Sequence, residues 1–149
     1  MEKWDMYIDL DLIQRKMEII EEEISFLKEM QKFNFSEFQE DIRNIKSVCR
    51  SFQNSIQVLI DIGNHIVSSL NLGKPEFYED IPKFLKNSGI ITSEFEEKFK
   101  RMIRFRNFLV HEYDKIDPSR IYIYLQYNLK DLEEGLKIIV NFLREIKNS

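Results

Sequence analysis

The sequence predicts an all-α protein, an antiparallel up-and-down bundle of four long helices and one short helix. Leu, Ile, Phe, Lys and Glu dominate, while the 149 residues include only 4 Gly and 3 Pro, and this composition favours helix over sheet. Apolar residues recur at three- and four-residue steps, and no alternating pattern is long enough to indicate a strand. The connections between the periodic segments are short, as in antiparallel bundles.

Two elements are expected in the N-terminal half. A helix is predicted over residues 9–32, and Asn34 interrupts it. Ser36 is the expected N-cap of a second, long helix that continues to about residue 70 along one apolar stripe. Gly63 belongs to that stripe, where the lack of a side chain suits close approach of another helix.

The C-terminal half is predicted to contain a short helix and two long ones. NLGKPEFYED marks a clear break, and a short helix is expected over residues 81–87. Ser93 and Glu96 match a capping box that opens the fourth helix. A turn over residues 114–117 precedes a fifth helix, which an Asp-Pro pair starts and which runs to about residue 146.

The length predicts a single domain over residues 1–149. The net charge of −4 argues against binding of polyanions by the surface as a whole. Cys49 is the one cysteine, so an internal disulfide framework is excluded and a reducing compartment is expected. The N-terminus lacks the pattern of a secretory signal, and no apolar stretch approaches the ~20 residues of a membrane span. We therefore expect a cytoplasmic protein that does not enter the membrane.

Several kinds of site are excluded. The sequence contains no glycine-rich phosphate-binding loop. Two histidines and one cysteine are too few for the usual structural zinc site. A di-iron bundle requires Glu three residues before His, but Ile62 and Phe108 occupy those positions. We expect neither a bound metal nor a cofactor.

The stretch FRNFLVHEY, residues 105–113, places four polar side chains inside an apolar run; they are Arg106, Asn107, His111 and Tyr113. Each helical residue turns by about 100°, so Arg106 lies about 140° from His111 around a regular helix. One stripe of that helix instead contains Lys100, Arg104, Asn107 and His111. Arg106 and His111 therefore meet only if the helix distorts or if another chain brings them together.

The same helix contains a basic segment, KFKRMIRFR at residues 98–106, that holds five positive charges in nine residues. Lys100, Arg101 and Arg104 are candidate contacts to the phosphates of a ligand. The alternative is a solvated face whose cations complement acids on neighbouring helices. Arg106 differs because it lies between Phe105 and Phe108, and a buried arginine is costly unless it has a partner or a task.

Asp61 and His65 lie four residues apart on one face of the second helix. The favoured interpretation is structural, with Asp61 orienting His65 at a bundle or dimer interface. A direct role of His65 in a catalytic cleft is the alternative.

FRNFLVHEY fits the R-x4-H-x-Y motif of HepT-like toxins, which belong to the HEPN superfamily. IDIGNHIV at residues 60–67 and KPEFYEDIPKFLKNSGIIT at residues 74–92 resemble further segments of that family, as does the DKID turn after the motif. The resemblance covers residues 56–121 well. The flanking helices resemble the family only in the general apolar pattern of packed helices.

This resemblance implies a homodimer in which the motifs of both protomers face one cleft. It implies a metal-independent endoribonuclease, the toxin of a type VII HEPN/MNT toxin–antitoxin system. In that site His111 acts as general acid and base, Arg106 stabilises the transition state, and Asn107 orients RNA or His111. Histidine suits proton transfer near neutral pH, and arginine presents a fork of donors to phosphate oxygens.

The resemblance also implies a partner, a minimal nucleotidyltransferase antitoxin of the MntA type that uses ATP and Mg. It would transfer AMP to Tyr113 and so silence the toxin. The seven-residue spacing from Arg106 predicts that the AMP group lies near that arginine, where its bulk and charge block RNA.

Two other functions are compatible with the helical pattern. The chain could be a non-catalytic substrate-binding subunit of a nucleotidyltransferase, or a dimerisation bundle with a degenerate site. The complete set of Arg106, His111 and Tyr113 favours the enzyme. The sequence does not distinguish transfer RNA from messenger RNA as the target.

Overall fold

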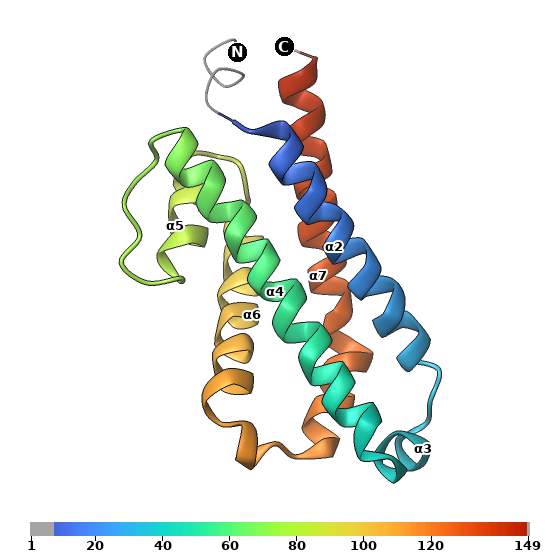
Figure 1. The fold of residues 1–149 in the computed structure, drawn as a ribbon. Coiled ribbons are helices and arrows are strands. Elements are labelled where there is room, and N and C mark those ends of the chain that lie inside the picture. Colours follow the sequence, from blue (N-terminus) through green and yellow to red (C-terminus); the bar gives the residue numbers. More distant parts are fainter. Residues whose placement is uncertain (1–7, 149) are drawn as a thin grey trace.

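The computed structural model describes residues 8–148 and contains, within them, four long helices that alternate in direction (Figure 1). Helix α4 packs against α2, α5, α6 and α7. The described part of the chain has no strand, so the predicted all-α up-and-down bundle is confirmed. The elements are α2 (Leu10–Met30), α3 (Phe35–Glu40), α4 (Ile42–Ser69), α5 (Asp80–Asn87), α6 (Ser93–His111), the 3-10 helix η1 (Tyr113–Lys115) and α7 (Pro118–Lys147).

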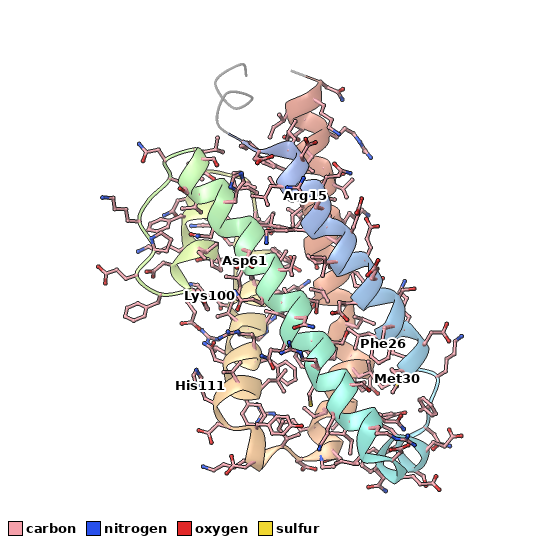
Figure 2. All side chains as sticks on the ribbon, viewed as in Figure 1. Arg15, Phe26, Met30, Asp61, Lys100 and His111 are labelled. Atoms are coloured by element: carbon pink, nitrogen blue, oxygen red, sulfur yellow. The ribbon has the colours of Figure 1, made fainter. Side chains whose placement is uncertain are left out.

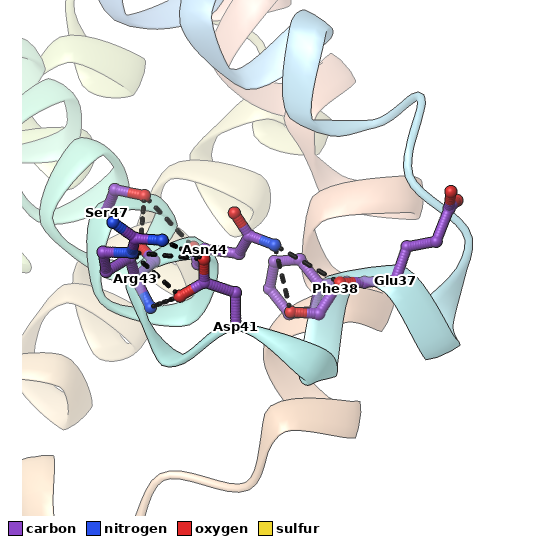
Figure 3. A network of polar contacts seen from close by, with 6 residues as sticks. All are labelled: Glu37, Phe38, Asp41, Arg43, Asn44 and Ser47. Carbon is purple, nitrogen blue, oxygen red and sulfur yellow. Dashed lines mark hydrogen bonds and ion pairs between the residues drawn. The ribbon is translucent and has the colours of Figure 1, made fainter.

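The predicted second helix is in fact two helices, α3 and α4. Asn34, not Ser36, is the N-cap of α3, and it exchanges hydrogen bonds of 2.8 and 2.9 Å with Glu37. The backbone is extended at Asp41, whose carboxylate accepts the N–H of Arg43 at 2.9 Å and so caps α4 (Figure 3). Two strong N-cap residues therefore divide what the apolar stripe presented as one element.

Helix α6 begins one residue away from the predicted capping box. Thr92 is its N-cap and accepts the N–H of Phe95 at 3.1 Å, so the prediction that Ser93 and Glu96 form the cap is wrong. Threonine supplies the same hydroxyl acceptor one residue earlier. The start of α7 is as predicted, because Asp117 accepts the N–H of Ser119 at 3.0 Å.

The buried side chains form one apolar cluster that all four long helices share. Gly63 lies at its edge, where α5 approaches α4. A Cβ added there would lie 2.8 Å from Cγ2 of Ile81 and 3.4 Å from Cδ1 of Leu85. The expected close approach at Gly63 is thus confirmed, and it fixes α5 and the loop before α5 beside α6. None of the helices within residues 8–148 has the length and apolar character to cross a membrane.

Candidate functional site

The candidate site lies at the C-terminal end of α6, which is an uninterrupted α-helix from Ser93 to His111. The helix does not distort between Arg106 and His111, so the two stay on different faces, about 140° apart. His111 is the last helical residue, and its exposed side chain lies on the side of α6 away from α2 (Figure 2). A single chain therefore does not pair these two residues.

Arg106 is half-buried and lies against aromatic and amide groups instead of a carboxylate. Its Nη1 donates to Oδ1 of Asn107 at 3.0 Å, and its guanidinium carbon lies 5.4 Å from the centroid of the Tyr78 ring. Its Nε is buried and has no hydrogen-bond partner. Residues 8–148 contain no ion pair to Arg106. Arg106 thus has no anionic partner within the described chain, and the N–H groups of its guanidinium that are not bonded to Asn107 can donate to an anion from outside.

The other cations of α6 are mostly neutralised, as the solvated-face interpretation expects. Lys98 pairs with Glu134 on α7 at 2.9 Å, and this hydrogen bond raises the pKa of Lys98. Two of the candidate RNA contacts also have carboxylate partners, Lys100 with Glu96 at 3.1 Å and Arg104 with Glu79 at 2.8 Å, while Arg101 is exposed. Their contact with RNA stays a prediction.

Tyr113 lies outside the helix that carries the rest of the motif. The backbone leaves the helical region at Glu112 (φ −121°, ψ 32°), and Tyr113 opens the 3-10 helix η1. The seven-residue spacing argument for a position near Arg106 assumed a continuous helix, so it does not hold in this structure. The Tyr113 side chain is 48% exposed, which makes it accessible to a modifying enzyme.

His65 and Asp61 have different partners from those predicted. Nε2 of His65 accepts the backbone N–H of Asp9 at 3.1 Å. Asp61, on α4 (Figure 2), accepts from Gln57 at 2.9 Å and lies 3.8 Å from Nζ of Lys16. Asp61 therefore does not orient His65 within the described chain, because an amide and an ammonium already occupy it. His65 instead joins the start of α2 to α4, which supports the structural interpretation.

Three residues near the site were not singled out from the sequence. Tyr78 lies against Arg106, Glu79 pairs with Arg104, and the guanidinium of Arg120 lies 4.0 Å from the ring centroid of Phe108. The two aromatic residues in KPEFYED could have drawn attention to the loop as part of the site. No sequence pattern indicated Arg120, because its contact with Phe108 depends on how α7 packs against α6. No cluster of three or more metal-ligating side chains occurs within residues 8–148.

Comparison with solved structures defines the class of protein. A tri-AMPylated HEPN toxin from Shewanella oneidensis, in complex with an MNT antitoxin, superposes with a TM-score of 0.81 at 27% identity, covering 89% of this chain and 99% of that chain. A toxin–antitoxin structure with AMP-PNP gives 0.80 at 27% identity, covering 88% and 98%. The fold is that of the HEPN toxins.

Sequence comparison identifies the family within this class. The family model for HepT-like ribonucleases matches residues 20–139. The mRNA nuclease HepT of Shewanella oneidensis is 30% identical over 104 residues, 70% of this chain and 78% of that protein. The tRNA nuclease HepT of Aphanizomenon flos-aquae is 27% identical over 134 residues, 89% and 90% respectively. The chain belongs to the HepT-like ribonuclease family, which confirms the resemblance and the enzyme class predicted from the motif.

Proposed function

We propose that this protein is the endoribonuclease toxin of a type VII toxin–antitoxin pair, and that it acts in the cytoplasm as a single-domain chain in a homodimer. The observation that carries the proposal is a pair of groups on α6 that have no carboxylate partner within the described residues. Arg106 has a buried Nε without a partner, and His111 is exposed at the helix end. They lie on different faces of one straight helix, so two copies are required to surround one phosphate with both groups.

The proposed chemistry is attack of a ribose 2′-hydroxyl on the adjacent phosphate, without a metal ion. The reaction needs a base for the hydroxyl proton, an acid for the leaving 5′-oxygen, and a cation for the crowded phosphate. Two copies of His111 supply the acid and the base, and Arg106 supplies the cation. Asn107 holds Arg106 in place through the hydrogen bond of 3.0 Å, a positioning role.

The first experiment incubates unmodified protein with end-labelled RNA in excess chelator. We expect the natural sequence to cleave the RNA and leave a 2′,3′-cyclic phosphate, and His111→Ala to lower the rate by at least about 10²-fold, the lower end for general acid–base catalysis. Full activity of His111→Ala would refute the mechanism. If confirmed dimers of the unmodified protein cleave nothing, the nucleotidyltransferase-subunit interpretation takes its place.

The dimeric site has its own test. Natural and His111→Ala subunits are mixed and exchanged in known proportions. If both copies of His111 serve one cleft, mixed dimers are inactive and an equal mixture retains about a quarter of the activity. If each chain acts alone, the same mixture retains about half.

We propose that the antitoxin is a nucleotidyltransferase that uses ATP and Mg to transfer AMP to Tyr113. The exposure of Tyr113 outside α6 supports this, as does the AMPylated state of the related Shewanella oneidensis toxin. Intact-mass analysis after incubation with the partner and ATP tests it. Tyr113→Phe should abolish the mass increase, whereas Tyr127→Phe, which removes a 67% exposed tyrosine on α7, should not.

A further inference from the structure

The loop over residues 74–79, between α4 and α5, presents two aromatic side chains to solvent beside the candidate site. Phe77 is 70% exposed and Tyr78 is 42% exposed. Phe77 is the most exposed large apolar side chain within the described chain. Tyr78 also lies against the guanidinium of Arg106, so the aromatic pair adjoins the group assigned to the phosphate.

The loop is held firmly at both ends of this aromatic pair. Oδ2 of Asp80 accepts the backbone N–H groups of Glu76 at 2.9 Å and Phe77 at 3.1 Å, and these bonds lower the pKa of Asp80. Glu79 forms its ion pair with Arg104 on α6 at 2.8 Å. The exposed rings are therefore presented by an ordered backbone, which reduces the entropy lost when a ligand stacks on them.

An open hollow of about 420 Å³ lies between this loop and α6, lined by Glu76, Phe77, Tyr78, Glu79 and Asn107. This volume falls in the range of small-molecule sites and accommodates a planar base. Asn107 connects the hollow to Arg106, because its Oδ1 already accepts from that arginine. The amide N–H groups of Asn107 remain as donors on the same side chain.

Charge selects which part of a nucleotide can enter the hollow. Glu76 and Glu79 line it. Glu79 is paired with Arg104, and the carboxylate of Glu76 repels a phosphate. An uncharged base avoids this repulsion and gains stacking on the aromatic faces. The phosphate of the same nucleotide is attracted to Arg106 next to the hollow.

We infer that this hollow binds the nucleobase beside the scissile phosphate of single-stranded RNA, with Phe77 and Tyr78 as the stacking surface. The inference rests on the proposed ribonuclease function and adds where the substrate base lies. Single-stranded RNA is specified because bases stacked inside a duplex are not free to stack on side chains.

The test measures equilibrium binding of single-stranded RNA containing 2-aminopurine, in a His111→Ala background that prevents cleavage. Phe77→Ala should weaken binding about tenfold and lessen the fluorescence quenching of 2-aminopurine, as expected for loss of one base–aromatic stack. Phe77→Trp should restore both. Tyr127→Ala, which removes a ring of similar exposure on α7, should change neither.

Parallel cleavage assays with His111 restored separate this inference from the proposed function. If the natural sequence cleaves RNA while Phe77→Ala binds and cleaves as well as Tyr127→Ala does, the base site is refuted and the ribonuclease stands. If the natural sequence does not cleave, the ribonuclease is refuted, and the binding series still decides the base site. Unchanged RNA affinity with a weakened dimer or antitoxin complex in Phe77→Ala would assign the loop to protein binding and overturn the inference.

Discussion

His65 and His111 lie on neighbouring helices, and the chain surrounds them in opposite ways. His65 is half-buried near the end of α4, where its Nε2 accepts the N–H of Asp9 at 3.1 Å and lies 3.4 Å from Oγ of Ser69. His111 is exposed at the end of α6 and makes no hydrogen bond within residues 8–148 beyond those of the helix backbone. These are the two histidines of the sequence.

The difference shows how environment assigns a role to one residue type. A ring nitrogen that accepts a backbone N–H is already occupied, and it holds two helices together. An exposed imidazole keeps both nitrogens available for proton transfer. The same contrast extends to the cations of α6, where Lys98, Lys100 and Arg104 have carboxylate partners and Arg106 has none within the described residues.

The largest expected effect comes from Arg106. Arg106→Ala should lower the RNA cleavage rate by about 10²- to 10³-fold, because it removes the proposed donor to the transition-state phosphate. Arg104→Ala is the matched control, a 58% exposed arginine paired with Glu79, and should lower the rate only several-fold. Single-turnover cleavage rates and melting temperatures of both variants measure this. Equal losses would mean that the α6 cations act as one general basic surface.

A smaller effect, on stability, is expected two residues before His65. Gly63→Ala gains about 1 kcal/mol of helix propensity, but its Cβ meets Ile81 at 2.8 Å, and overpacking costs about 1–3 kcal/mol. We expect a net loss of about 1 kcal/mol in the free energy of unfolding, measured by urea denaturation. Asn64→Ala, at the next and exposed position of α4, should be neutral or slightly stabilising. Stabilisation by Gly63→Ala would show that α5 moves away freely.

The smallest effect is expected at His65. His65→Ala should lower stability by at most about 1 kcal/mol, the usual contribution of one hydrogen bond, and leave RNA cleavage unchanged. Denaturation and cleavage assays on one preparation measure both. A folded His65→Ala protein that no longer cleaves RNA would place His65 in the cleft and erase the contrast with His111.

The long helices were predictable because their apolar periodicity spans many turns, and the start of α7 was predictable because Asp117 and Pro118 carry strong local signals. The break between α3 and α4 at Asp41 was not predictable in this way. Phe38 and Ile45 are buried on either side of it, so the apolar pattern continues across one extended residue. Ile42 also fits the spacing of that pattern, but its side chain is 58% exposed. Local periodicity does not report where the helix direction changes.

The motif placed Arg106, Asn107 and His111 on one helix, as observed in α6, but Tyr113 lies beyond the end of that helix. The angle between Arg106 and His111 follows from helix geometry alone. The placement of Tyr78 against Arg106 depends on how α5 packs, and helical spacing along α6 carries no information about it. The hydrogen-bond partner of His65 is likewise on another element, since it is the backbone N–H of Asp9, the N-cap of α2.

The missing side chain at Gly63 links core packing to the proposed base site. Because no Cβ stands between α4 and α5, Ile81 packs directly against the backbone of α4, and the loop that carries Phe77 and Tyr78 leads into α5 just before this contact. A side chain at position 63 would therefore displace the rings of the proposed base site without contacting RNA. RNA preference would then depend in part on an interior residue that no substrate contacts.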